Sequence, residues 1–242
     1  MEIIVNADDF GRSQIINKAI AEAFDKHFIQ QTTIMANMPS FDEAVQLSKD
    51  YGFFDRVGLH INLDEGTPIT CEMKENQNFC TNGIYHGHFF QVLKNRFVLN
   101  KRDKESIECE LIAQMNKYIN AGFTLMHYDS HHFVHNNISV YRVVKKLGLE
   151  REFRSARIAE YNPSDSFFKH LYKVFFNKLV SRDFQTTRQF IQNLSNYEEN
   201  RGSCELMTHP FFIEGNLVDV LSWEPLITKS FEEHYSIIRN FR

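Results

Sequence analysis

The chain has little of the proline and glycine that usually interrupt or link folded units. Its 242 residues include only 5 prolines and 10 glycines, which argues against disorder and against several domains joined by flexible linkers. Hydrophobic residues make up 43% of the chain, and this is enough to bury a full core. We therefore expect one folded domain over residues 1–242.

Long apolar runs and an excess of basic residues are also missing. No window approaches the roughly 20 uncharged apolar residues of a membrane-spanning helix. The opening residues, MEIIVNADDFG, lack the basic and apolar regions of a signal peptide. The net charge is −4, so nothing favours a surface that follows nucleic-acid phosphates. We expect a cytoplasmic protein without a membrane or nucleic-acid partner.

The cysteines are too far apart for a metal-binding or redox pair. Cys71, Cys80, Cys109 and Cys204 form no CxxC motif. In a cytoplasmic protein the default state is a reduced, mostly buried thiol, so we assign them no chemistry.

Short apolar runs alternate with amphipathic helical patterns, and this alternation predicts an α/β fold with a parallel sheet. The expected strands cover residues 3–5, 32–35, 57–59, 123–126, about 153–158, and 204–207. The expected helices follow Ser13, run from 41 to 49, follow a cap at Asp103, begin at Asn136 or Asn137, and cover 231–241. Residues 62–101 should form a loop or cover with some local structure, and about 165–200 a helical insertion.

Polar and charged residues stand at the ends of these apolar runs. Because parallel strands place their carboxyl ends at one rim of a sheet or barrel, we expect such residues to meet in one site. They are Asp8, Asp9, Asn37, His60, His127, Asp129, His131, Arg154 and His209.

A carboxylate and two imidazoles with an open position form a recurring catalytic metal site. Asp9, His60 and His131 would supply such a set from three strands. In an extended run His127, Asp129 and His131 share a face, so Asp129 could orient a ligand histidine. These residues also have purely structural interpretations. Asp8 or Asp9 could cap the next helix, and His60 could be a hydrogen-bonded core residue.

Four stretches, NADDFG, GLHINLDEGTPI, HYDSHHFVH and ELMTHP, resemble in order the motifs of the YdjC-like carbohydrate deacetylases. The resemblance covers about residues 2–210 and implies a distorted parallel β/α barrel of the glycoside hydrolase/deacetylase type. It also implies one divalent metal ion, zinc or magnesium, held by Asp9, His60 and His131. Two positions depart from the family pattern: Phe133 stands where members often have a histidine, and Phe211 where they have a glycine, which affects the shape of the substrate pocket.

The resemblance implies a hydrolase that removes the N-acetyl group from N-acetylglucosamine-containing chitooligosaccharides and releases acetate. Asp8 is then the candidate general base and His209 the candidate general acid, although Asp8 and Asp9 could exchange the roles of base and ligand. Arg154 would orient Asp8 or hold a sugar oxygen. The candidates for supporting a ligand or binding substrate are His127, Asp129 and His132.

The two adjacent aspartates set a geometric condition. Neighbouring residues of a strand point to opposite faces, so Asp8 and Asp9 can share a site only if the strand ends or bulges there, near Gly11. Two other functions stay open: a metal-dependent phosphoesterase or esterase, and an inactive sugar-binding relative. The expected partner is a small acetylated amino sugar, and the chain could form a homodimer.

Overall fold

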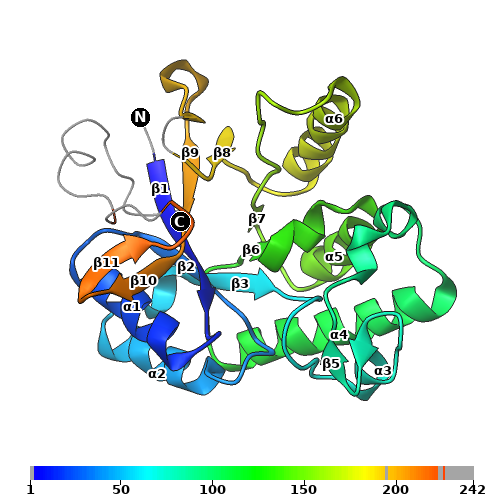
Figure 1. Cartoon of the computed structure of the whole chain (residues 1–242), viewed down its shortest axis with the longest axis horizontal. Helices are drawn as coiled ribbons and strands as arrows, with labels where there is room; N and C mark the ends of the chain where they lie inside the picture. The colour runs from blue at the N-terminus through cyan, green and yellow to red at the C-terminus, as the bar shows by residue number, and fades with distance from the viewer. Residues whose placement is uncertain (1–2, 194–195, 223–225, 227–242) are drawn as a thin grey trace.

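The computed structural model describes residues 3–193, 196–222 and 226. A sheet of seven parallel strands forms its centre (Figure 1). In chain order the strands are β1 (Ile3–Phe10), β2 (Gln31–Ile34), β3 (Val57–Ile61), β6 (His127–Ser130), β7 (Ser155–Ala156), β8 (Gln189–Ile191) and β9 (Cys204–Thr208).

The sheet is curled, and its two ends are β7 and β8 (Figure 1). Neighbours in the sheet are β7-β6-β3-β2-β1-β9-β8, so successive strands of the chain lie side by side and β9 returns to pair with β1. We call the gap between β7 and β8 the seam. Across it, an isolated parallel bridge pairs Ser155 with Gln185, which precedes β8. This distorted β/α barrel confirms the expected fold class.

Five longer helices connect successive strands and lie outside the barrel (Figure 1). They are α1 (Gln14–Asp25), α2 (Phe41–Asp50), α4 (Lys101–Asn120), α5 (Ile138–Glu150) and α6 (Phe167–Asp183). The strand β1 is buried along its whole length, as expected for a parallel strand covered on both faces. Among the described residues, no helix combines the length and apolarity needed to cross a membrane.

Smaller elements fill the connections. Residues 62–100 contain the expected local structure: α3 (Cys71–Lys74), the hairpin of β4 (Cys80–Thr81) and β5 (Ile84–Tyr85), and the 3-10 turns η2 (Phe89–Gln91) and η3 (Leu93–Arg96). Further 3-10 turns are η1 (Phe54–Arg56), η4 (His131–Asn136) and η6 (Glu199–Arg201). A hairpin of β10 (Pro210–Ile213) and β11 (Asn216–Asp219) follows the last barrel strand. The helix expected at 231–241 lies outside the described residues.

Side-chain hydrogen bonds cap the starts of α1, α4 and α6. The Ser13 hydroxyl accepts a hydrogen bond from Ile16 N (3.4 Å), as predicted for α1. In α4 the cap is Asn100, whose side chain accepts from Asp103 N at 2.8 Å. The prediction of Asp103 as the cap was therefore wrong by one turn. Both residue types can cap, and the acidic residue instead lies in the first turn of the helix, where its charge favours the helix dipole.

The apolar run at 123–126 is not a strand, because β6 begins at His127. Phe123 packs its ring against the rings of Phe54 and Tyr118, with centroids 4.7 and 5.2 Å away. The Tyr118 hydroxyl donates to the carbonyl of Leu125. This carbonyl is thus satisfied by a helix side chain, and strand pairing starts two residues later.

The segment at about 165–200 contains the expected helix, α6, but it is part of the barrel rather than an insertion. After α6 the chain forms β8, which pairs in parallel with β9. On α6 the side chain of Phe176 is fully buried, whereas that of Phe175 is 53% exposed. Apolar side chains on the exposed face of α6, among them Phe168 and Phe175, blurred the helical periodicity and hid this ordinary helix–strand unit from sequence reasoning.

Phe176→Ala should lower the free energy of unfolding by about 3–5 kcal/mol, because it removes a large core side chain. Phe175→Ala, one residue away and largely exposed, is the matched control and should change it by less than about 0.5 kcal/mol. Urea unfolding followed by circular dichroism measures both values. Equal, small effects would show that α6 is only loosely attached.

Candidate metal and active site

The end of β1 bulges at the two aspartates. The pairing register with β2 shifts between Ala7 and Phe10, and Asp9 adopts a left-handed backbone with φ of 70°. A non-glycine residue there costs about 1–3 kcal/mol and persists only where its surroundings hold it. The bulge meets the condition set by the sequence, since Asp8 and Asp9 both line one cavity.

Three side chains from three strand ends meet beside this bulge. The Asp9 Oδ1 atom lies 2.9 Å from Nδ1 of His131, which follows β6, and 3.3 Å from Nε2 of His60 on β3. One ligand atom from each residue lies within 4.8 Å of the other two. This is the donor set that a catalytic divalent metal uses.

The second nitrogen of each histidine faces another carboxylate. His60 Nδ1 lies 2.7 Å from Asp129 Oδ1, and His131 Nε2 lies 2.7 Å from Glu65 Oε2. Carboxylates in this position fix the ring orientation of metal-binding histidines. The buried Nε2 atom of His60 has no hydrogen-bond partner among the described residues. When the ring is neutral and Nδ1 donates to Asp129, Nε2 presents its lone pair toward Asp9, so the residues fit a metal ion.

The loop after β3 brings Glu65 to the site. Asn62 accepts a hydrogen bond from Glu65 N (3.0 Å) and donates to Glu65 O (2.7 Å). Asn37, at the end of β2, donates to the same carbonyl at 3.2 Å. Arg12 then bridges Glu65 Oε1 (2.8 Å) and Asp9 Oδ2 (3.0 Å). Sequence reasoning gave Glu65 no role, although it lies inside one of the four motifs.

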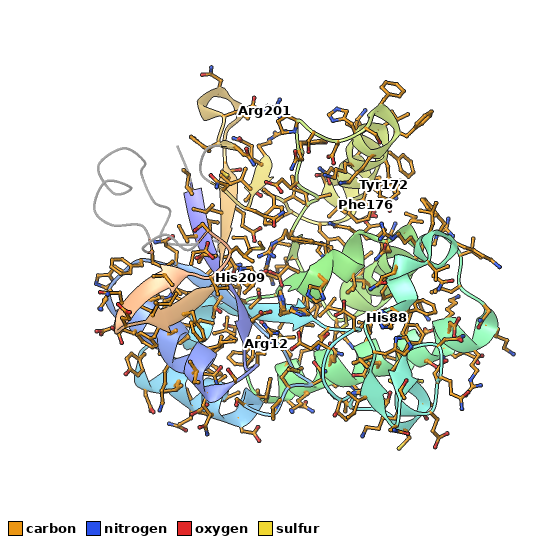
Figure 2. The ribbon with its side chains drawn as sticks, viewed as in Figure 1. Arg12, His88, Tyr172, Phe176, Arg201 and His209 are labelled. Carbon is orange, nitrogen blue, oxygen red and sulfur yellow. The ribbon has the colours of Figure 1, made fainter. Side chains whose placement is uncertain are left out.

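These groups open into a cavity of about 300 Å³ at the carboxyl ends of the strands. His209 contributes a ring whose Nδ1 atom is buried without a hydrogen-bond partner among the described residues. Figure 2 labels two side chains of the cavity, Arg12 and His209, which lie near the end of β1. Apolar side chains complete the lining: Ile16, Phe133, Met207, Phe211, Val220 and Leu221.

Comparison with known proteins decides the family. The family model described as YdjC-like protein matches residues 2–234. The chain belongs to the YdjC-like family. A curated relative from Vibrio parahaemolyticus, named carbohydrate deacetylase, is 30% identical over 234 residues and is matched over 82% of its length and 95% of this chain. One of the same name from Geobacillus stearothermophilus is 32% identical over 219 residues, covering 80% of that protein and 87% of this chain.

A solved structure agrees with the barrel. It comes from Enterococcus faecalis V583, is named for cellobiose-phosphate cleavage, and matches with a TM-score of 0.66 at 22% identity. The match covers 88% of this chain and 82% of that one, and at this identity it supports the fold alone. Family membership confirms the resemblance drawn from the motifs, and with it the expected enzyme class, a carbohydrate deacetylase.

The charges of the YdjC-like site are strongly coupled. Burial alone would lower the pKa of His60, but the charge of Asp129 and the hydrogen bonds around the ring raise it to about 10. For His131, burial is likewise outweighed by hydrogen bonds with Asp9 and Glu65, and the pKa rises to about 9. Burial opposes the charged form of Asp9, yet the two histidines hold its pKa well below the ordinary value. In the metal-free protein both rings therefore carry protons at neutral pH.

A fully buried guanidinium, that of Arg157, holds Asp8. Its NH1 and NH2 atoms donate to the two Asp8 oxygens at 2.7 and 2.6 Å. The same group pairs with Asp129 Oδ2 at 2.6 Å and with Glu205 Oε1 at 2.7 Å. Burial raises the pKa of Glu205 to about 7 against the opposing charge of Arg157. Asp8 is thus held rigidly in the wall of the cavity.

The prediction that Arg154 orients Asp8 was wrong, because Arg157 makes that contact. Arg154 is exposed and lines a different groove. It precedes β7, at the amino end of the strand, whereas Arg157 follows β7 at the carboxyl end. Since the site lies at the carboxyl ends, only the later arginine can reach it.

The two other predicted histidines, His127 and His132, differ in their position relative to the cavity. His127, at the amino end of β6, contacts Ser155 Oγ at 3.1 Å and lies outside the cavity, and burial lowers its pKa to about 4. His132 lies on the rim, its side chain 66% exposed and its Nδ1 atom 2.9 Å from Asp64 Oδ2. Of the two, the structure brings only His132 to the cavity.

The raised pKa values predict how the metal-free protein responds to base. Protons on His60 and His131 stabilise the fold fully below the unfolded histidine value near 6.5, and this contribution is lost as the pH rises through about 9 and 10. Thermal unfolding of chelator-treated protein should therefore show a falling Tm from about pH 7 to 10. His131→Gln should flatten part of this slope, and the exposed His170→Gln should not. A flat profile in the unmodified protein would contradict the ion pairs.

Proposed function

We propose that this YdjC-like protein is a metal-dependent N-deacetylase of small N-acetylglucosamine-containing oligosaccharides, such as chitooligosaccharides, and that it releases acetate. The supporting observation is the convergence of Asp9, His60 and His131 at ligand distance from one another. Asp8 and His209 line the same cavity. Amide hydrolysis needs an activated water, stabilisation of an oxyanion and a proton for the leaving amine, and this set of residues suits all three.

One divalent cation, zinc or magnesium, would be held by Asp9, His60 and His131. When bound, it supplies a Lewis acid that lowers the pKa of water to near 7 and polarises a carbonyl. Two imidazoles favour zinc over magnesium by ligand softness. Asp129 fixes the orientation of the His60 ring, and Glu65 that of the His131 ring, each through the nitrogen that does not face the metal position.

The proton transfers fall to Asp8 and His209. Arg157 and Asn6 fix the Asp8 carboxylate, and each carboxylate oxygen keeps further lone-pair capacity for the proton of an attacking water. Nδ1 of His209 has no hydrogen-bond partner among the described residues, which leaves it free to hold a proton for the leaving nitrogen. Asp8 then acts as general base and His209 as general acid.

The shape of the cavity favours a short substrate. A volume of about 300 Å³ lies at the small end of ligand pockets and suits one acetylated sugar ring. Phe133 and Phe211 line it and offer apolar surface to a sugar face or an acetyl methyl group. We therefore place one N-acetylglucosamine unit in the cavity, with any further unit outside.

Acetate release from diacetylchitobiose tests the proposal. The protein should release acetate, lose this activity on treatment with a chelator, and regain it when zinc or magnesium is added back. Turnover of nitrophenyl phosphate without acetate release would instead favour a phosphoesterase. Sugar binding without any turnover would indicate an inactive relative, and acetate release that survives complete metal removal would overturn the metal-dependent mechanism.

Two histidine variants separate metal binding from proton transfer. His131→Ala should remove bound metal and activity together, because it deletes a ligand. His209→Ala should keep the metal but lower kcat by about 10²–10⁴-fold, the usual contribution of a general acid. Metal content by plasma mass spectrometry and acetate release are measured on both, with the exposed His170→Ala as control. Full metal occupancy in His131→Ala would show that the ligand set is wrong.

A further inference from the structure

A second hollow lies on the flank of the barrel, away from the catalytic cavity. It has a volume of about 830 Å³, and its lining comes from α6 and from the residues on both sides of the seam between β7 and β8. Apolar side chains, among them Phe153, Ile158 and Phe184, form part of its lining. We call it the seam groove. None of its lining residues is shared with the catalytic cavity.

The seam groove collects positive charge. Arg154, Lys178, Arg182 and Arg188 line it and are exposed. In the described part of the chain, the charged side-chain groups of Arg154, Lys178 and Arg188 have no ion-pair or hydrogen-bond partner. Such a cluster is unexpected in a chain of net charge −4, because like charges raise one another's energy unless an anion lies between them.

The acidic residue in the lining does not neutralise this charge. The Asp183 carboxylate is already engaged by Tyr141 (2.7 Å), Lys145 (3.0 Å) and Arg182 (3.2 Å). Its pKa is lowered to about 2, since these partners outweigh the effect of burial. The groove therefore presents three unpaired cations above an apolar surface, with Tyr161, Ser181 and Thr186 as hydroxyl groups in the lining.

We propose that the seam groove binds a phosphate monoester of a small organic molecule. Guanidinium groups match phosphate oxygens in geometry and charge, and Arg154, Arg188 and Lys178 supply the cations. The apolar lining and Tyr161 suit the carbon skeleton of the ester rather than a free ion. This assignment does not depend on the proposed deacetylase activity.

The two arginines stand on opposite sides of the seam. Arg154 directly precedes β7, and Arg188 directly precedes β8. Between these strands the sheet is held by the bridge from Ser155 to Gln185. An anion that contacts both arginines would tie the seam together, and the strand it fixes continues into Arg157, the partner of Asp8. Occupancy of the groove should thus stabilise the closed barrel.

Glucose 6-phosphate is the probe, compared with glucose and inorganic phosphate by calorimetry and thermal unfolding on the metal-loaded protein. We expect saturable binding of glucose 6-phosphate, at least tenfold weaker binding of the other two, and a Tm rise of about 3–5 °C at ten times Kd. The double variant Arg154→Gln/Arg188→Gln should lose at least tenfold in affinity. A control with two exposed cations outside the groove, Arg142→Gln/Lys104→Gln, should bind normally.

Loss of ester binding in the seam groove can be distinguished from loss of deacetylase activity. The Arg154→Gln/Arg188→Gln variant should release acetate from diacetylchitobiose at the unmodified rate when no phosphate ester is present. Unchanged affinity in this variant would show that the ester binds outside the seam groove and would overturn the proposal. If glucose 6-phosphate does not bind at concentrations up to about 10 mM, a very weak affinity, or if inorganic phosphate binds equally well, the proposal is also overturned.

Discussion

The buried guanidinium of Arg157 is the group on which the rest of the site depends. It is fully buried and meets carboxylates from three strands: Asp8 of β1, Asp129 of β6 and Glu205 of β9. An ionised carboxylate buried without a partner costs several kcal/mol, and here three would face one another if the cation were absent. Because Arg157 follows β7 while Glu205 lies beyond the seam, the same contacts also help to close the barrel. Charge pairing and barrel closure are therefore coupled.

Acidic groups still outnumber guanidinium groups at the mouth of the barrel. The guanidinium groups are Arg12 and Arg157, and the carboxylates are Asp8, Asp9, Glu65, Asp129 and Glu205. Burial raises the pKa of Glu205 to about 7, and when Glu205 is protonated two negative charges are left over. Protons on His60 and His131 balance them in the metal-free protein, and one divalent cation with both rings neutral balances them equally well. Metal binding should therefore displace protons from the two rings, so that its affinity weakens in acid.

Local features of the sequence located most strand ends and most of the site. An apolar run followed by polar residues is visible in a few consecutive positions, and this pattern led to Asp9, His60 and His131, which the structure brings together. Arg157 and Glu65 were missed because their roles rest on contacts with residues far away in the chain, 149 positions in the case of Asp8 and 66 in the case of His131.

A very short strand does not show from its sequence which of its flanking residues face the site. The strand β7 has only two residues, so no alternation of polar and apolar positions could tell which of Arg154 and Arg157 faces the site. The run at 123–126 looks like a strand in isolation, but tertiary contacts of Tyr118 and Phe123 override that preference. The α6–β8 unit was taken for an insertion because a helix with an exposed apolar outer face gives no clear periodic signal.

The left-handed conformation of Asp9 shows why these features occur together. Its backbone is strained, its carboxylate is buried, and its Oδ1 atom faces two histidines. Each feature alone would destabilise the barrel, since burial and strain are both costly. The ion pairs with Arg12, His60 and His131 offset part of this cost only while the bulge keeps Asp9 turned toward them. The ion pairs of Asp9 thus hold the bulge in place, and the bulge is what allows these ion pairs to form. A substitution that removes one of the two should therefore also disturb the other.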